Sequence, residues 1–378
     1  MSLQQIIAII IFLCTMGAII TGKVHNTVAS LTGAACLVLT HILSIEDCVD
    51  AVDVETICIL VGMMLLVAVI KNSGIFEYIA IKAAKIAKGR PWPIMVIFIF
   101  ITAVCSGMLD NVTTVLLVGP MTLAITNILK VDPVPYIITQ IMASNIGGTA
   151  TLIGDPPNIM IGSAAKLSFV DFILNTGVAT VFVIIVGLIC MYFIYGRKLF
   201  VTDESIVKVM QLDENKAIKD RKLMHESVII LVALCFIFHD QLGVQSCTVA
   251  IAAACIMLLI GGQEPEEIIA DVEWPTILFF IGLFIVVGGM KKVGVITMLA
   301  NGLISITHGN MVVTMMVILW VSAIVSSFLD NIPFVATLIP MILTMQSEGM
   351  DVAPIWWALS LGACLGGNGT LIGASANV

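Results

Sequence analysis

Charged residues are scarce in this sequence. Only 11% of its 378 residues are Asp, Glu, Lys or Arg, whereas 60% are apolar, and the mean hydropathy is +1.12. Soluble globular domains carry about 25% charged residues, so this composition excludes that class. Apolar runs of about 20 residues are long enough for helices that cross a bilayer. The sequence therefore predicts an all-α polytopic membrane protein.

Several common signatures are also absent. The ten cysteines stand singly in apolar segments without a C-x-x-C pair, so we interpret them as small core residues and not as a redox or metal centre. The first 20 residues lack a basic start and a cleavage site, which favours a retained span over a signal peptide. No lysine follows the glycine-rich stretch at 148–154, and G-x-G-x-x-G does not occur. We expect no cofactor and no nucleic-acid partner.

Apolar windows predict the membrane spans. In the first half they lie at 4–21, 27–43, 55–71, 136–161 and 172–196, and in the second half at 226–239, 247–262, 275–290 and from 354 onward. Two longer apolar regions, 93–129 and 311–346, are each broken near the middle. Each can form two spans with about 16 to 18 residues per arm, or a re-entrant hairpin with Asp-Asn at its tip.

The two breaks carry copies of one motif, 220 residues apart. Ser106-Gly-Met-Leu-Asp110-Asn111 recurs as Ser326-Ser-Phe-Leu-Asp330-Asn331. A lone carboxylate facing lipid costs about 2.5 to 3.5 kcal/mol on insertion scales, so an unused one is improbable. We interpret Asp110 as half of an ion-binding site that Asp330 completes, and we expect both carboxylates to bind the coupling cation or proton.

The duplication extends along the chain. Gly62 and Gly74 recur as Gly282 and Gly294, and the run 147–158 recurs as 366–377. Five spans and one re-entrant hairpin per half make an odd number of crossings, so the halves should be inverted repeats with interrupted helices at the midplane. We assign 1–196 to the first repeat, 197–222 to a cytoplasmic linker and 223–378 to the second repeat. By comparison with the first copy, the second should continue for about 35 to 40 further residues.

The basic residues predict the orientation. With hairpins at both breaks, 14 of the 17 Lys and Arg residues fall on one face, which places the linker in the cytoplasm and the N-terminus outside. This charge pattern excludes a single crossing at each break, but it does not separate a hairpin from a pair of spans. The segment 75–90 is predicted to be an amphipathic helix on the cytoplasmic surface, and the linker a solvated connection. We expect a multi-pass protein of the plasma or inner membrane.

Polar residues gather at the breaks, where a helix interrupted in the bilayer frees backbone groups that only protein or water can satisfy. Hydroxyls and amides there can supply ligands to an ion. Besides the two Asp residues, the candidate ligands are Asn111, Thr113, Asn145, Thr149, Thr151, Asn158, Asn331, Asn368, Thr370 and Asn377. Asp155 precedes Pro156 and faces Ala374 in the second copy, so a helix-capping role is favoured over ion ligation.

The glycine-rich run and the two L-D-N motifs together resemble those of a known transporter superfamily. The run S-N-I-G-G-T-A-T-L-I-G-D-P-P-N at 144–158, with L-D-N at 109–111 and 329–331, resembles the ion transporter superfamily, in its branch of arsenite permeases, NhaD-type sodium/proton antiporters and the P protein. Proteins of this branch are often called citrate-transporter-like. The resemblance implies a scaffold domain, a moving transport domain that holds the hairpins, an elevator-like motion and a homodimer.

The resemblance also exposes a difference. In the related dicarboxylate carriers the hairpin tips carry Ser-Asn-Thr, whereas this chain has Asp110-Asn111-Val112-Thr113 and Asp330-Asn331-Ile332-Pro333. Two fixed carboxylates would repel a di- or tricarboxylate unless protons or cations intervene. The sequence therefore favours a secondary transporter that exchanges Na⁺ for H⁺ or expels a small inorganic species such as arsenite.

Three alternatives belong to other classes. A carboxylate or other anion symporter would share the fold, and an ion channel would share the spans. An intramembrane aspartyl protease also uses two membrane Asp residues, but it would need G-x-G-D, and Leu152 stands at the first Gly position before Gly154-Asp155. We therefore expect a transporter and not an enzyme.

Overall fold

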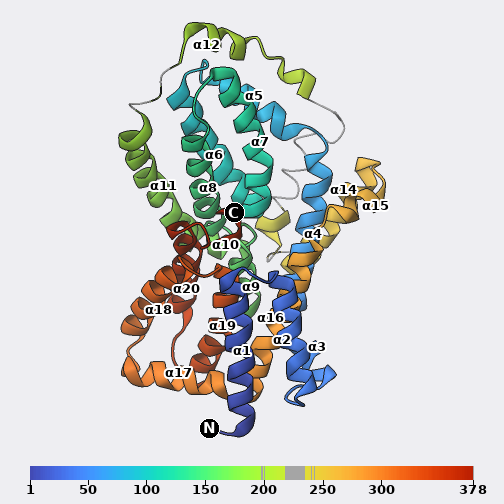
Figure 1. Ribbon diagram of the computed structural model, residues 1–378, viewed down its shortest axis with the longest axis vertical. Helices are drawn as coiled ribbons and strands as arrows, with labels where there is room; N and C mark the ends of the chain where they lie inside the picture. Colours follow the sequence, from blue (N-terminus) through green and yellow to red (C-terminus); the bar gives the residue numbers. More distant parts are fainter. Residues whose placement is uncertain (197–198, 200, 218–234, 240, 242, 378) are drawn as a thin grey trace. The chain divides into compact units, whose positions relative to one another are not determined.

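The computed structural model describes residues 1–377 except 197–198, 200, 218–234, 240 and 242. Within this part of the chain, all regular secondary structure is helical (Figure 1), which confirms the all-α prediction. The chain divides into two compact units, and each takes segments from both halves of the sequence. Unit 1 comprises Met1–Val61, Ile159–Leu167 and Glu273–Ala374, and unit 2 comprises Gly62–Asn158, Ser168–Val272 and Ser375–Val378.

Unit 1 is built around two close helix pairs, α2 with α16 and α18 with α20. Gly282 allows the first approach, because a Cβ there would lie 2.8 Å from the backbone of Ser30. The helices of this unit are α1 (Leu3–Thr21), α2 (Asn26–Leu39), α3 (Ile45–Ala51), most of α9 (Pro156–Ala165), α16 (Trp274–Lys292), α17 (Val295–Ile306), α18 (Met311–Ser326), α19 (Asn331–Ser347), α20 (Ala353–Gly366) and the short turn η4 (Gly367–Gly369).

Unit 2 has its core among four neighbouring helices, α5 to α8, with Phe98, Ile125 and Tyr136 buried between them. Its helices are most of α4 (Val54–Lys71), α5 (Ile75–Ile86), α6 (Pro91–Met108), α7 (Asn111–Leu129), α8 (Val134–Thr149), α10 (Phe169–Phe172), the π-helical η1 (Ile173–Gly177), α11 (Val178–Met191), the π-helical η2 (Tyr192–Gly196), α12 (Asp203–Met210), η3 (Glu214–Ala217), α14 (Ser246–Gly261), α15 (Pro265–Ala270) and η5 (Ser375–Asn377).

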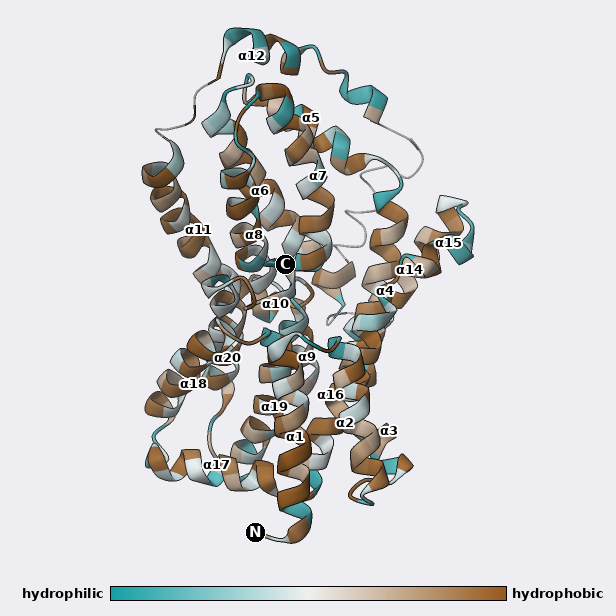
Figure 2. Cartoon of the chain, viewed as in Figure 1, coloured by the Kyte–Doolittle hydropathy of each residue, from teal (hydrophilic) through white to brown (hydrophobic). Residues whose placement is uncertain are grey.

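Among the described residues, six helical segments are long and apolar enough to cross a membrane, and a bent pair formed by α17 and α18 could add a seventh. The six are α1, α4, α6, α7, α16 and the continuous helix Phe169–Gly196. That last helix leaves a wide apolar surface, with α11 strongly apolar in Figure 2, as expected for contact with lipid. Most of the span predicted at 226–239 lies outside the described residues.

One predicted span is wrong. The window 136–161 is not a single helix, because α8 ends at Thr149 and α9 begins only at Pro156. Two glycines and the Pro156-Pro157 pair end the regular helix there, since proline lacks the N–H that a helix interior requires. The interruption gives the chain a short irregular segment, 150–155, at the point where the candidate ligands lie.

The breaks at the two Asp residues are confirmed. The chain leaves α6 at Met108 and enters α7 at Asn111, and it leaves α18 at Ser326 and enters α19 at Asn331. The arms contain 18 and 19 residues in the first copy and 16 and 17 in the second. At about 1.5 Å per residue each arm approaches the thickness of the bilayer core, so length does not separate a hairpin from two crossings.

Helix boundaries recur along the chain with the spacing of the sequence motifs. Both α5 and α17 have 12 residues, and each follows a glycine in the left-handed conformation, Gly74 with φ 81° and Gly294 with φ 79°. Only glycine adopts such a φ without strain. The glycine pair singled out in the sequence therefore has a local structural reason.

The linker differs from its prediction. As expected, α5 is amphipathic and buries Phe76, Ala80 and Ala84. However, 203–217 is not merely a solvated connection, because it forms α12 and η3, and Ser205 and Val209 of α12 are buried. An apolar side chain every few residues among charged ones gives this short helix one face that packs against the protein.

Candidate ion-binding site

Asp110 stands at the tip of the turn between α6 and α7, where it is the N-cap of α7. Its backbone is extended, and its carboxylate accepts a hydrogen bond of 2.7 Å from the N–H of Thr113 and a second one from the Thr113 hydroxyl. This is a helix N-cap, in which the side chain satisfies a free donor and its charge favours the positive end of the helix. Taken as a whole residue, Asp110 has an intermediate exposure.

Beside this tip lies a chain of three buried amides. The Nδ2 of Asn111 donates to Oδ1 of Asn145 at 3.1 Å, and the Nδ2 of Asn145 donates to Oδ1 of Asn377 at 2.9 Å. The hydroxyl of Ser144 donates to the Asn111 carbonyl at 2.9 Å. The amide chain thus joins the start of α7 and the C-terminal part of α8 to η5, which lies 232 residues after Asn145 in the sequence.

The irregular segment after α8 gathers backbone carbonyls. The Nδ2 of Asn158 donates to the carbonyls of Gly148, Thr149 and Thr151 at 3.3, 3.2 and 2.9 Å. The hydroxyl of Thr151 donates to the Gly107 carbonyl, which ties this segment to the end of α6. Carbonyls released where a helix stops must find partners, and here one amide serves three of them.

Gly154 keeps this region closed. A Cβ on Gly154 would lie 2.5 Å from the carbonyl oxygen of Ser106 and 2.7 Å from that of Gly148, so no side chain fits. The hydroxyl of Ser106 in turn donates to the Ser144 carbonyl at 2.6 Å. Carbonyl oxygens from two helix ends therefore crowd one glycine, which holds the irregular segment close against α6 and α8.

Unit 1 contains the same local structure at the second break. Asp330 caps α19 by accepting a 3.2 Å hydrogen bond from the N–H of Ile332, and the Thr370 hydroxyl donates to the Ser327 carbonyl. A Cβ on Gly373 would lie 2.7 Å from the oxygen of Gly367 and 2.8 Å from that of Ser326. Each unit thus holds one Asp-capped helix start beside crowded carbonyl oxygens.

The candidate residues fall into two groups. Unit 2 brings together Asp110, Asn111, Thr113, Asn145, Thr149, Thr151, Asn158 and Asn377, and unit 1 holds Asp330, Asn331, Asn368 and Thr370. Ser106 and Ser144 were not among the ligands predicted from the sequence, although both stand in the quoted motifs and Ser106 recurs as Ser326. Asp155 is buried directly before Pro156, the first residue of α9, which is the position expected for a capping side chain.

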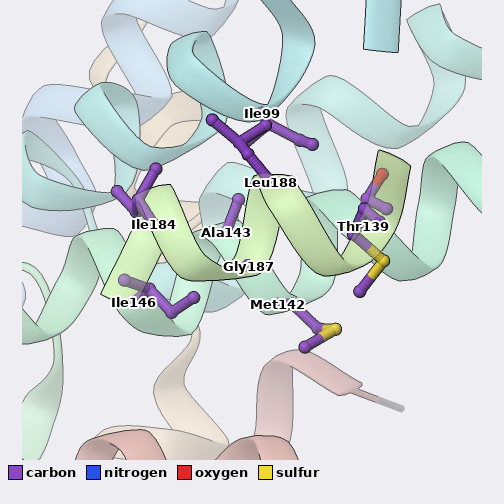
Figure 3. A pocket seen from close by; sticks show the side chains of 9 residues that line it. Ile99, Thr139, Met142, Ala143, Ile146, Ile184, Gly187 and Leu188 are labelled. Atoms are coloured by element: carbon purple, nitrogen blue, oxygen red, sulfur yellow. The ribbon is translucent and has the colours of Figure 1, made fainter. Parts of the chain in front are cut away.

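An apolar cavity in unit 2 lies apart from these ligands. It has a volume of about 20 Å³ between α6, α8 and α11 and is lined by residues including Ile99, Ala143, Gly187 and Leu188 (Figure 3). A cavity of this size could hold one water, but its walls are mostly apolar, and Thr139 is the one polar side chain among the described lining residues. No group of three or more His, Cys, Asp or Glu side chains that could hold a metal occurs among the described residues.

Comparison with known proteins decides the class. A sequence model described as citrate transporter matches residues 16–362. The chain belongs to this citrate transporter family. It is 41% identical over 385 residues to an uncharacterized transporter of Mycobacterium tuberculosis, covering 99% of this chain and 89% of that protein. It is also similar to a 46 kDa membrane protein of Mycobacterium leprae, with 39% identity over 99% of this chain and 90% of that protein.

A more distant relative is the human P protein. The identity is 31% over 99% of this chain, which matches 55% of the P protein. Membership of the citrate transporter family confirms the predicted resemblance, establishes a multi-pass secondary transporter of a small solute, and confirms that the chain is not an enzyme.

Proposed function

We propose that this member of the citrate transporter family moves a small ion across the membrane in exchange for Na⁺ or H⁺, with Asp110 and Asp330 binding the coupling ion. Na⁺/H⁺ antiport and arsenite-type efflux are the two forms that we favour. The observation that carries the proposal is the turn at Asp110 in unit 2, where a carboxylate that caps α7 stands beside a chain of buried amides at a helix break.

The chemistry of this tip supports a cation. Asp, Asn and Thr side chains and backbone carbonyls supply only hard oxygen ligands, which suit Na⁺. A carboxylate at the same place can take up a proton instead, and competition between the two for one site is a simple basis for exchange. The amide chain from Asn111 to Asn377 would hold the ligands in place during binding.

Carboxylate symport is the second candidate, because the matching family is described as citrate transporter. A carboxylate substrate would be repelled by a bare Asp110. The repulsion falls when a cation or a proton occupies that site, so symport would require the coupling ion to bind first.

The architecture that accompanies this function is also part of the proposal. The matched helix boundaries support two inverted repeats, each with a re-entrant hairpin, joined by the cytoplasmic linker 197–222 and with the N-terminus outside. An elevator-like motion of the hairpins in a homodimer of the plasma or inner membrane would then give alternating access.

A gradient panel in proteoliposomes tests the proposal. Gradients of Na⁺, Li⁺, arsenite and citrate are imposed one at a time while the internal pH is followed. Antiport predicts that an outward Na⁺ gradient acidifies the interior, whereas symport predicts citrate uptake that depends on Na⁺ or H⁺. Flux that does not saturate and does not couple to any ion would indicate a channel and refute the proposal.

Two variants connect the flux to the site. Replacement of Asp110 or Asp330 by Asn keeps the size and a hydrogen-bonding oxygen that can still cap the helix, but it removes the charge. We expect normal expression and folding with loss of coupled flux in each variant. Gradient-driven transport at the wild-type rate in both would show that these carboxylates do not bind the coupling ion.

A further inference from the structure

The junction between α5 and α6 is a short turn. Lys88 and Gly89 both adopt left-handed backbone conformations, with φ 53° and 67°. His308 and Gly309 repeat these values at 51° and 67° between α17 and α18, two helices that meet at 117°. Domain motions are commonly absorbed by a few residues between helices, so these junctions are the natural points for a hairpin to turn.

The linker covers one junction and not the other. A Cβ on Gly89 would lie 3.0 Å from Cγ2 of Ile206 and 3.4 Å from its Cβ, so α12 packs directly on the first junction. A Cβ on Gly309 would have no described atom within 4 Å. The linker therefore packs on the α5–α6 junction, whereas no described atom packs on Gly309 at the α17–α18 junction.

Further contacts tie the linker to both sides of the α5–α6 junction. The α12 helix contacts α5 and α7, and η3 contacts α5. Val209 is fully buried in the cluster that contains Ala84 of α5 and Leu129 of α7. The docked linker thus bridges α5 to an arm of the hairpin that carries Asp110.

Opposite charges accompany the apolar contact. Lys85 of α5 forms an ion pair with Glu214 of η3, and this bond, with nearby Lys82, lowers the pKa of the Glu214 carboxyl. The pKa of Glu204 is lowered by Lys208 in its own helix and then by Lys130 after α7. The Lys85–Glu214 pair is partly exposed, and ion pairs that reach solvent are screened by salt, so an attachment of this kind can be reversible.

We propose that α12 and η3 form a latch which, when docked, locks the α5–α6 junction and holds the first hairpin still. Release of the linker would let α6 and α7 turn as one body together with α8, against which α6 is closely packed, and so raise the rate of transport. This regulation rests on the proposed movement of the hairpin, but it does not depend on which ion is carried.

A reversible crosslink tests the lock. In the double variant Gly89→Cys with Ile206→Cys, the Cβ separation of about 3.4 Å lies near the range for a disulfide. Oxidation should lower the initial rate of transport at least tenfold, and a reductant should restore it. Each single variant, treated in the same way, reports any effect of the substitution alone. A crosslinked protein that transports as fast as its reduced form overturns the latch.

Weakening the latch gives the opposite readout. Glu214→Gln removes the charge of the partly exposed partner of Lys85 and should raise the maximal rate severalfold while leaving the apparent substrate affinity unchanged. Lys208→Gln is the matched control, since its ion pair with Glu204 lies within α12. An unchanged rate in Glu214→Gln, while the wild type transports, would count against the latch. Flux uncoupled from every ion in the wild type would count instead against the proposed function.

Discussion

Gly147→Ala should damage the protein at the contact between α6 and α8. The added Cβ would lie 2.1 Å from the carbonyl oxygen of Ala103 and 2.5 Å from its Cα. Both are backbone atoms of a neighbouring helix, so no side-chain rotation can relieve the clash. A contact of 3.0 Å is the shortest that real Cβ atoms show, and reaching it requires a displacement of about 0.9 Å.

This displacement has two consequences. Overpacking of a core costs about 1 to 3 kcal/mol, and a clash with backbone belongs at the upper end of that range. In addition, Asn145 lies two residues before Gly147 and is held between Asn111 and Asn377. Binding groups must keep their positions to within about 0.5 Å, so a shift of α8 should abolish transport even in molecules that remain folded.

The matched control is Gly187→Ala in α11. A Cβ there meets no described atom within 4 Å and would enter the small apolar cavity. Alanine in a helix is better than glycine by about 0.5 to 1 kcal/mol, but this gain applies to both helices and cancels. The two variants should therefore differ by the cost of overpacking, about 2 to 3 kcal/mol. Thermal unfolding of the purified proteins and flux in proteoliposomes measure both effects. Equal stability and equal flux in the two variants would refute the packing argument.

Three further predictions concern single side chains. Asp155→Ser should keep most transport, because capping needs only an oxygen acceptor, whereas Asp155→Ala should lower the free energy of unfolding by about 0.5 to 2 kcal/mol. Complete loss of flux in a folded Asp155→Ser protein would instead make Asp155 an ion ligand. Asn158→Ala should lower the unfolding midpoint markedly, since three buried carbonyls lose their shared donor, while an unchanged midpoint would mean that water replaces the amide. The bond to Lys292 and then the bonds from Ser44 lower the pKa of the Asp47 carboxyl in the folded protein. The stability that the Asp47–Lys292 pair adds is therefore present above the ordinary pKa of Asp. It is lost as the pH falls through the lower pKa of the folded protein. Lys292→Gln should therefore reduce the dependence of the unfolding midpoint on pH below about 4, and an unaltered pH profile would contradict this.

Much of the fold was predictable because its signals are local. Composition indicated the membrane, apolar windows located most spans, and Asp110 and Asp330 marked the breaks. The two errors have a shared cause. The window 136–161 averaged over the Gly- and Pro-rich interruption, and the charged residues of 197–222 concealed the buried Val209. Hydropathy averages are insensitive to a single residue that ends a helix or fills a core position.

The sequence by itself determined that the chain is a membrane protein with two copies of one Asp-containing break, since composition and repetition can be read without knowledge of the fold. It also determined the helix starts, because an acidic cap acts on donors two or three residues away. Only the tertiary structure brought Asn377 to Asn145, 232 residues apart, and placed Ile206 on Gly89. Contacts of this kind join segments that leave no mark on each other's composition, so only the packing of the folded chain decides them.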